Sequence, residues 1–167
     1  MRPFTLALAA LALGTAPALA QETEKPPAAP VPAAKPDKPA MMDQYQWGKA
    51  PAGLPEGAEV AVLKGDPTKP GPYTIRLRVP DGYRVAPHSH PAAENLTVVS
   101  GVLLVAHGPN MRSAGPATLE AGGKLALAAD APHSVTAKGV TIVEIESTGP
   151  FAIKYLNQAD DPRGTGT

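Results

Sequence analysis

Residues 82–101 of the chain read GYRVAPHSHPAAENLTVVSG. His88 and His90 are separated by one residue, and Glu94 follows four residues after the second histidine. Alternate side chains of a β-strand share a face, so His88 and His90 can point at one metal ion while Ser89 points away. The proline and two alanines that precede Glu94 favour a bend that brings its carboxylate back toward the imidazoles. Three metal-competent side chains within seven residues, in a chain with only four histidines, predict a metal site.

The spacing of these residues resembles the first motif of the cupin superfamily, G-x5-H-x-H-x3-E-x6-G. Every position of that motif matches, from Gly82 to Gly101. A second motif of the family, G-x5-P-x-G-x2-H-x3-N, supplies a further histidine from an adjacent strand. The run that starts at Gly122 reaches His133 at the corresponding spacing. The resemblance therefore adds His133 to the candidate ligands.

The match to the second motif is partial. Ala128 replaces its proline, Asp130 replaces its second glycine and Ala137 replaces its asparagine. Aspartate tolerates left-handed backbone better than most residues, so Asp130 can still form a tight turn. We expect these departures to affect the geometry of the loop more than the ligand role of His133.

The resemblance implies a double-sheet jelly-roll barrel that holds one divalent metal through three histidines and one glutamate, here His88, His90, Glu94 and His133. Three imidazoles and a carboxylate, with no thiolate, suit Fe, Mn, Zn, Ni, Co or Cu, and they do not choose among these metals. Four protein ligands leave one or two positions open on a five- or six-coordinate ion, whereas a structural zinc site is closed and usually rich in cysteine. The remaining histidine, His107, lies outside both motifs, and we expect it at the surface or rim.

The rest of the chain is predicted to be all-β. Side chains at residues 73–79 alternate between apolar and polar, which is the pattern of a half-buried strand. Further short strands are predicted near residues 94–98, 102–106, 125–128, 133–137, 140–147 and 151–156. Turn signals rich in glycine and proline separate them, including a turn at Gly101, and many short strands of this kind form a sandwich or barrel. An immunoglobulin-like sandwich fits the strand pattern as well, but the H-x-H-x3-E cluster has no role in it.

Two segments are predicted to precede the folded domain. Residues 1–20 combine the basic Arg2, an apolar run from Phe4 to Leu13 and a small-x-small cleavage site, which is typical of a secretory signal peptide. Residues 21–42 contain six prolines interleaved with alanine and lysine, and this composition predicts a linker without a packed core. The cupin domain would then span residues 43–167. The predicted signal peptide, together with the absence of cysteine from the chain, indicates a bacterial periplasmic or secreted protein.

Charge and composition narrow the range of molecules that the protein is expected to bind. The chain has 15 basic and 15 acidic side chains, and no basic block stands out. Nothing therefore argues for nucleic acid, or for a membrane surface once the signal peptide is removed. A small-molecule ligand or substrate is the partner that an open metal site in a barrel implies. Outer strands of such barrels offer unpaired edges, so a homodimer is also expected.

These observations leave three hypotheses about function. The first is an exported metalloenzyme that acts on a small organic molecule, with dioxygenase-like chemistry on an acid or phenol. The second is a non-catalytic metal- or ligand-binding or sensing cupin. The third is a metal-free binding barrel, which would require the complete first motif to be vestigial. No sequence feature identifies a catalytic residue beyond the ligands, or names the substrate.

Several other residues carry weaker expectations. Arg84 shares the parity of His88, but Pro87 interrupts the strand between them, which favours a surface arginine. Tyr45 and Trp47 are expected to anchor the start of the domain over the barrel end. The pattern leaves open whether Glu144 and Glu146 face inward.

Overall fold

A computed structural model describes residues 44–108, 111 and 115–164 of the chain. The predicted signal peptide and linker lie outside the described residues. The strands are β1 (Gly48–Lys49), β2 (Glu59–Lys64), β3 (Gly71–Val79), β4 (Arg84–Ser89), β5 (Glu94–His107), β6 (Ala117–Glu120), β7 (Lys124–Leu127), β8 (His133–Gly149) and β9 (Lys154–Tyr155), followed by one 3-10 turn, η2 (Gln158–Asp160). No helix in this part of the chain is long and apolar enough to cross a membrane.

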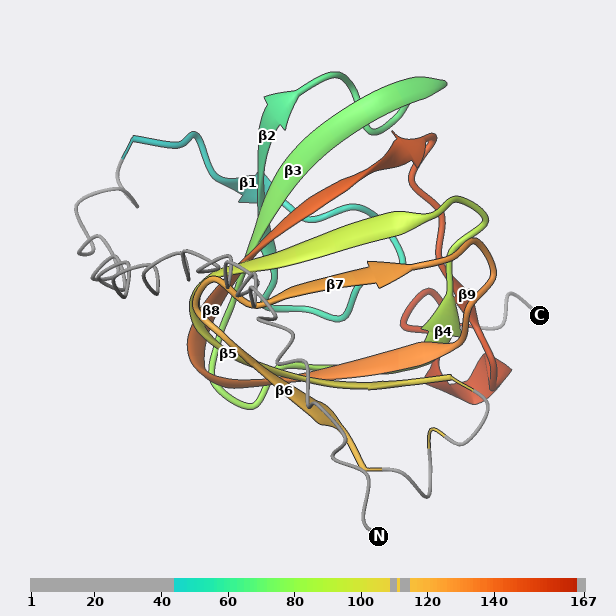
Figure 1. The fold of residues 1–167 in the computed structure, drawn as a ribbon. Coiled ribbons are helices and arrows are strands. Elements are labelled where there is room, and N and C mark those ends of the chain that lie inside the picture. The colour runs from blue at the N-terminus through green and yellow to red at the C-terminus, as the bar shows by residue number, and fades with distance from the viewer. Residues whose placement is uncertain (1–43, 109–110, 112–114, 165–167) are drawn as a thin grey trace, which may run out of the picture. The chain divides into compact units, whose positions relative to one another are not determined.

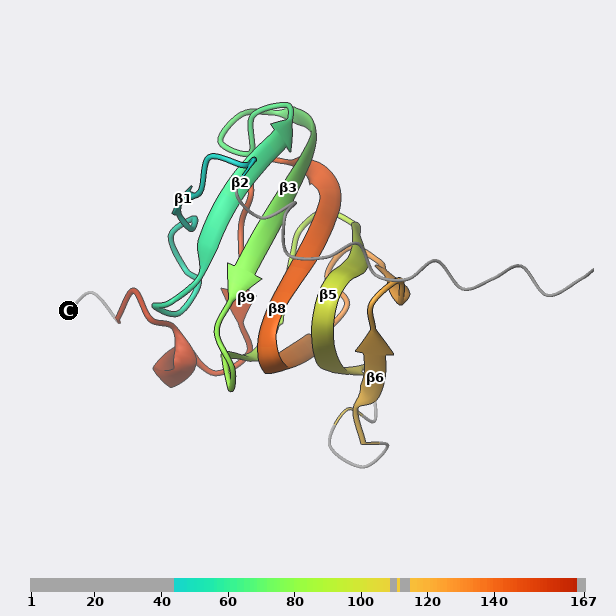
Figure 2. The ribbon, with the colours of Figure 1, turned by 90° about the vertical axis from the view of Figure 1, so that its left-hand side faces the viewer.

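Two long strands, β5 and β8, pair with each other along most of their length and belong to both layers of the fold (Figure 1). On one side, β3 pairs with the second half of β8 and β2 pairs with β3, while β7 pairs with the first half of β5. On the other side, β4 pairs with the first half of β8, and β6 pairs with the second half of β5. Figure 2 shows β2, β3, β8 and β5 side by side in one curved layer. This arrangement is the predicted jelly-roll barrel.

The two long strands bend at Gly101. The pairing of β5 with β8 shifts register on both sides of Ser100, between Val98 and Val102. Gly101 has a φ of +81°, and a Cβ atom at this position would lie 2.5 Å from Oγ1 of Thr141. Only glycine combines this left-handed backbone with so close an approach. The last glycine of the first motif therefore allows one strand to pass from one sheet to the other.

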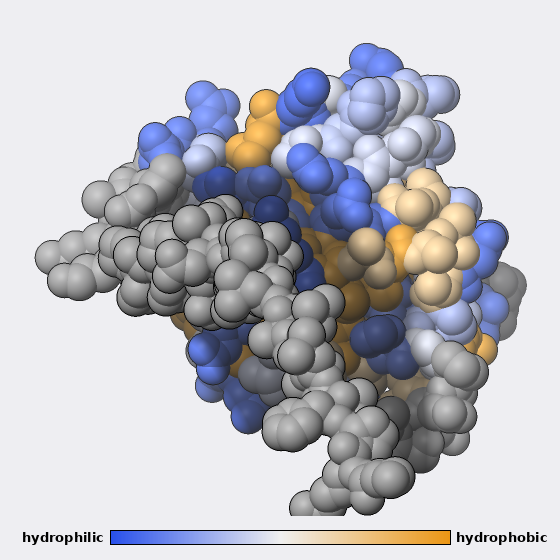
Figure 3. All heavy atoms as spheres, in the orientation of Figure 1, coloured by the Kyte–Doolittle hydropathy of each residue, from blue (hydrophilic) through white to orange (hydrophobic). Residues whose placement is uncertain are grey.

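Alternation along β3 explains which faces are buried. Tyr73, Ile75, Leu77 and Val79 are all buried, as the period-two pattern predicts, and the residues between them are not. The main core combines the first three of these side chains with those of β5, β7 and β8, while Val79 belongs to a second hydrophobic cluster. Figure 3 shows hydrophilic residues over the outer faces of the sheets and apolar residues in the hollow between them. The inner apolar surface of the barrel surrounds the candidate site.

Several predicted strand boundaries were wrong. Residues 94–98 and 102–106 form one strand, β5, and residues 133–137 and 140–147 likewise form one strand, β8. The glycine signals in both runs mark bends inside continuous strands rather than turns. The predicted strand at 151–156 is reduced to β9. Strands β1, β2 and β6 were not predicted, because each is short or mostly exposed and shows no clear alternation.

Candidate metal centre

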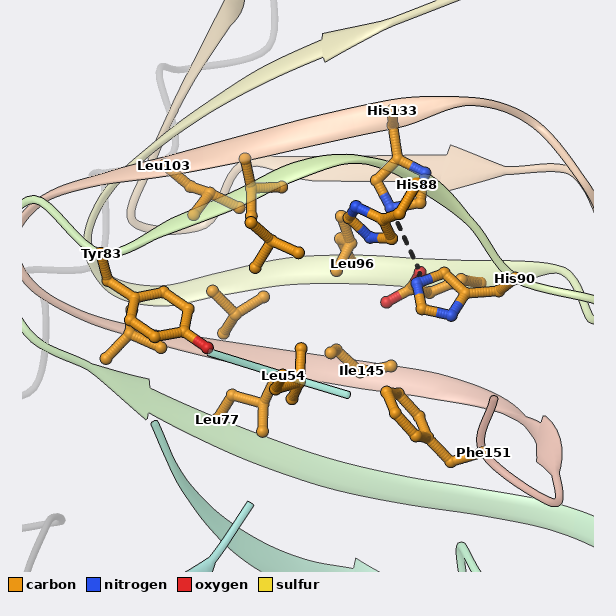
Figure 4. Close-up of a pocket in the computed structure, with 15 residues that line it drawn as sticks. Leu54, Leu77, Tyr83, His88, His90, Leu96, Leu103, His133, Ile145 and Phe151 are labelled. Carbon is orange, nitrogen blue, oxygen red and sulfur yellow. Dashed lines mark ion pairs between the residues drawn. The ribbon is translucent and has the colours of Figure 1, made fainter. Parts of the chain in front are cut away.

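Three elements bring the four predicted ligands to one end of the barrel. His88 is near the end of β4 and His90 follows that strand, while Glu94 begins β5 and His133 begins β8. His88 and His133 are partners in the pairing of β4 with β8. A ligand nitrogen from each of the three histidines lies within 4.8 Å of the other two. The spacing of the first motif and the strand pairing that joins it to the second motif thus create a single cluster (Figure 4).

The second nitrogen of each imidazole is held by a backbone carbonyl. Nδ1 of His88 lies 2.7 Å from the carbonyl oxygen of Ala86, and Nδ1 of His133 lies 3.1 Å from that of Ala131. Nδ1 of His90 lies 2.7 Å from the carbonyl oxygen of Ala152. A carbonyl can only accept a hydrogen bond, so each Nδ1 must carry the proton and each Nε2 keeps its lone pair. The backbone therefore sets all three histidines in the tautomer that binds a metal through Nε2.

The carboxylate of Glu94 lies beside the Nε2 atoms of the histidines, and no hydrogen-bond donor is shared among these acceptors. Its Oε2 lies 3.3 Å from Nε2 of His90 and 3.8 Å from Nε2 of His133. In a neutral imidazole with its proton on Nδ1, Nε2 has no proton to donate to this oxygen. Oε2 is fully buried and has no hydrogen-bond partner. Buried polar atoms are almost always paired, so this group of lone pairs calls for a shared cation or proton.

Burial keeps His88 and His133 in the neutral state that metal binding needs. Removal from water lowers the pKa of His88 to about 3, with a further contribution from the neighbouring His133. Burial likewise lowers the pKa of His133 to about 4, against the effect of its hydrogen bond to Ala131. Both imidazoles are therefore neutral at pH 7. Burial raises the pKa of Glu94, and His90 partly opposes that shift. A bound cation would favour the charged carboxylate.

The donor set fits a divalent transition metal. Three neutral imidazole nitrogens and one carboxylate oxygen are ligands for Fe, Mn, Co, Ni, Cu or Zn, and the cluster contains no thiolate. The nitrogens come from two neighbouring strands and the segment after one of them, so the barrel preorganises the ligands. The three histidines could therefore hold a metal ion. Glu94 is placed to add a fourth ligand.

The degraded second motif keeps the conformation that its loop requires. Asp130 has a φ of +57° and is the only described residue other than glycine with a positive φ. This is the left-handed conformation that the sequence predicted aspartate would tolerate in place of glycine. The amide of Asp130 donates to the carbonyl of His90 at 2.7 Å. The turn thus ties the segment before His133 directly to the first motif.

A cavity adjoins the histidines inside the barrel. It has a volume of about 60 Å³. Figure 4 shows His88, His90 and His133 at one end and Tyr83 at the other, with Leu54, Leu77 and Phe151 along one side. The lining residues are Leu54, Leu77, Val79, Tyr83, Val85, His88, His90, Glu94, Leu96, Leu103, His133, Val135, Val143, Ile145 and Phe151. A ligand in this cavity would touch both the metal site and apolar side chains.

The other predicted residues lie away from the cavity. His107 and Arg84 are exposed, as expected. Glu144 faces outward and pairs with Arg76 at 2.8 Å, which answers the question that the pattern left open. The expectation for Tyr45 and Trp47 was wrong: their rings lie over Arg76 and Arg78 of β3, at 4.8 and 4.6 Å, and not over the barrel end. These two arginines belong to the outward-facing row of the strand, so the aromatic rings cover the outer face of the sheet.

Sequence reasoning missed the groups that support the ligands. The carbonyls of Ala86, Ala131 and Ala152 orient the imidazoles, but a backbone carbonyl leaves no signal in residue identity. Leu54 lies outside every predicted strand and Phe151 begins the predicted strand at 151–156, but nothing in the sequence placed either residue at the cavity.

Comparison with known proteins shows the fold. No protein-family model and no curated protein sequence matches the chain. Among solved structures, it is similar to the polyketide cyclase RemF from Streptomyces resistomycificus, with a TM-score of 0.60 and 11% identity over 72% of this chain and 85% of that one. It is also similar to the DMSP lyase DddQ from Ruegeria pomeroyi, with a TM-score of 0.53 and 17% identity over 67% of this chain.

A third similar structure is the salicylate 1,2-dioxygenase of Pseudoaminobacter salicylatoxidans in complex with gentisate, with a TM-score of 0.52 and 18% identity over 65% of this chain. The chain spans 61% of the lyase and 31% of the dioxygenase. At these identities the likeness concerns the fold, which agrees with the architecture that the two sequence motifs predicted.

Proposed function

Because this protein has the cupin fold, we propose that it is an exported metalloprotein that binds one divalent transition-metal ion through His88, His90, Glu94 and His133. The observation that carries the proposal is a cluster of three histidine nitrogens within 4.8 Å of one another, next to a buried carboxylate oxygen that has no hydrogen-bond partner. This oxygen lies 3.3 Å from Nε2 of His90 and 3.8 Å from Nε2 of His133. Each Nδ1 is already occupied by a backbone carbonyl, so the lone pairs cannot be satisfied by turning the rings. One cation would satisfy all four groups.

We further propose that the site is catalytic and acts on a small organic molecule, with dioxygenase-like chemistry as the leading reaction type. A bound metal would supply Lewis acidity or redox chemistry with dioxygen. The chain itself supplies four ligands, which leave coordination positions free, and an adjacent apolar cavity that excludes water and orients the substrate. The fold is shared with a dioxygenase and with a lyase, which supports a catalytic role without choosing the reaction.

A second candidate, a non-catalytic metal- or ligand-binding module, is favoured by one feature of the cavity. Apart from the four proposed ligands, its only polar lining residue is Tyr83. The hydroxyl of Tyr83 donates to the carbonyl of Pro55 at 3.0 Å. The lining therefore offers no separate general acid or base, and any reaction would depend on the metal and its own ligands.

The experiment that separates the two candidates begins with protein purified from its native compartment. We expect close to one metal ion per chain by elemental analysis. Oxygen uptake is then measured against a panel of small carboxylic acids and phenols. Bound Fe or Mn with substrate-dependent oxygen uptake supports the enzyme, whereas tightly held Zn without turnover supports the binder. Absence of any stoichiometric metal would contradict both.

Export and assembly are part of the proposal. The pattern of residues 1–20 supports cleavage before Gln21 and a periplasmic or secreted protein. N-terminal sequencing of the mature protein after cell fractionation tests this. The barrel has strands with a single neighbour, such as β6 and β7, and edge pairing through such strands would form a homodimer. Sedimentation at micromolar concentration tests the assembly.

A further inference from the structure

The cavity beside the histidines offers a ligand one polar end and one apolar end. Ten of its fifteen lining residues carry hydrocarbon side chains, and among these Leu54 and Leu77 lie on the side of the cavity away from His88 and His133 (Figure 4). Tyr83 lies at the far end, with its hydroxyl already donated to Pro55. All other polar lining groups belong to the proposed metal site. A polar group of a ligand can therefore be bound only at the proposed metal site.

The cavity also lacks a positive charge. Among the described residues, no lysine or arginine lines it. Arg76 and Arg78 face the other side of the sheet, where they pair with Glu144 and Glu59. A ligand with a second charged group would have to bury that group among hydrocarbon side chains without a counter-charge. Such burial is strongly unfavourable, because an ionised carboxylate loses its water and gains no partner.

Leu54 limits the size of the ligand. Its side chain lines the cavity and packs against both hydrophobic clusters of the barrel. The residues on either side of it are anchored: the hydroxyl of Tyr155 donates to the carbonyl of Gly53 at 2.7 Å, and that of Tyr83 donates to the carbonyl of Pro55. Two tyrosines thus hold the backbone of Leu54 in place from both sides. The backbone that carries this part of the cavity wall is therefore held in place.

The size of the cavity agrees with this role. About 60 Å³ is more than the roughly 10–15 Å³ that one water molecule needs, and well below the ~300–1,000 Å³ of pockets for drug-sized ligands. A ligand of a few carbon atoms is the class that such a space admits.

We propose that the site selects a small molecule with a single metal-binding oxygen group on a short hydrocarbon body, and that Leu54, on the side wall of the cavity, limits how bulky that body can be. This inference rests on the proposed metal site and names its substrate class. It excludes dicarboxylates and other ligands with a second charge, because nothing in the cavity neutralises that charge.

The first test compares two ligands of equal length on the Co²⁺-loaded protein. Butyrate and succinate both have four carbons and differ by the distal carboxylate. Binding is followed by the change in the visible absorption of Co²⁺. We expect butyrate to bind at least 10-fold more tightly. Two carboxylates bind a free metal ion at least as well as one, so such a preference must come from the cavity. Equal or tighter binding of succinate would overturn the inference, although the metal site would stand.

The second test uses Leu54→Ala with butyrate and 3,3-dimethylbutyrate, which has the same chain length and two additional methyl groups. The substitution removes three carbon atoms from the side wall of the cavity, so the affinity ratio of 3,3-dimethylbutyrate to butyrate should rise at least 5-fold over wild type. Leu156→Ala is the matched control, because Leu156 is 54% exposed and does not line the cavity. An unchanged ratio in Leu54→Ala, or an equal rise in the control, would refute the role of Leu54. Circular dichroism checks that both variants are folded, and failure of wild type to bind Co²⁺ would instead contradict the proposed function.

Discussion

Nδ1 of His90 lies 2.7 Å from the carbonyl oxygen of Ala152, across 62 residues of sequence. This hydrogen bond joins the first motif to the segment that follows β8. The ring of the adjacent Phe151 lies 5.6 Å from that of His90, centroid to centroid, and lines the cavity. The orientation of one proposed ligand therefore depends on a part of the chain that neither motif includes.

Phe151→Ala should weaken metal binding without removing a ligand. Loss of the ring lets water reach His90 and loosens the segment that supplies the carbonyl of Ala152. We expect a fall in affinity within the roughly 10–100-fold range of changes outside the ligand set, measured by competition with a chelating dye. Leu156→Ala, an exposed position on the same segment, is the control and should bind as wild type.

Glu94→Gln should reduce metal affinity by more than about 100-fold, because it removes the only negative charge from the ligand set. The metal-free protein should stay folded. A glutamine amide can donate to the Nε2 lone pairs that the carboxylate faces, so its urea midpoint should be unchanged or higher. His107→Ala is the control, since that histidine is exposed, and it should leave metal affinity unaltered. Equal losses from both substitutions would show that the wrong groups have been assigned.

His133→Ala tests the ligand on the degraded second motif. The three first-motif ligands would remain, with an additional water on the metal, so affinity should fall and activity should fall further. Metal titration and absorption of the Co²⁺ form measure the two effects. If affinity and spectrum stay unchanged, a three-ligand site of His88, His90 and Glu94 is the better description, and it would strengthen an iron oxygenase assignment.

Gly101→Ala should destabilise the fold severely. The substitution forces a side chain into left-handed backbone, which costs about 1–3 kcal/mol, and places a Cβ atom 2.5 Å from Oγ1 of Thr141. Gly139→Ala separates the two effects: its φ is +70°, but nothing lies within 4 Å of the added atom. Urea unfolding should show a clearly larger loss for position 101. Similar losses at both positions would mean that the close approach contributes nothing.

The metal-free Glu94→Gln variant should lose stability as the pH falls below about 6.5. Burial lowers the pKa of His88 to about 3 and that of His133 to about 4, from an ordinary value of 6.5. Between the lowered pKa values and 6.5, the unfolded chain binds protons that the folded protein does not, so acid favours unfolding. Above pH 6.5 these histidines no longer make the stability depend on pH.

The measurement is a series of urea midpoints from pH 8 to pH 5 in the presence of a chelator. It is made in Glu94→Gln, because burial raises the pKa of Glu94 and would act in the opposite direction. Adding His88→Leu should make the urea midpoint depend less steeply on pH. An equally steep dependence would exclude His88 as its cause.

The sequence alone determined the parts of this protein that depend on local periodicity and spacing. Alternation along residues 73–79 predicted β3 and its buried face, because the pleat of a strand has a period of two. The spacing of His88, His90 and Glu94 predicted one cluster, because three side chains so close in sequence have few ways to lie apart. The position of Asp130 predicted a left-handed turn, since this conformation is a property of single residues.

Tertiary structure decided what depends on partners distant in the chain. Gly101 and Gly139 resemble turns in sequence, but β5 and β8 continue through them as bent strands, because the pairing of the two strands resumes on either side of each glycine. The proton positions on the histidines follow from three backbone carbonyls, which residue identity does not encode. Leu54 and the two tyrosines that hold its neighbours meet only in the folded barrel. Local patterns therefore identify the candidate ligands, while long-range packing orients them and shapes the cavity that selects a ligand.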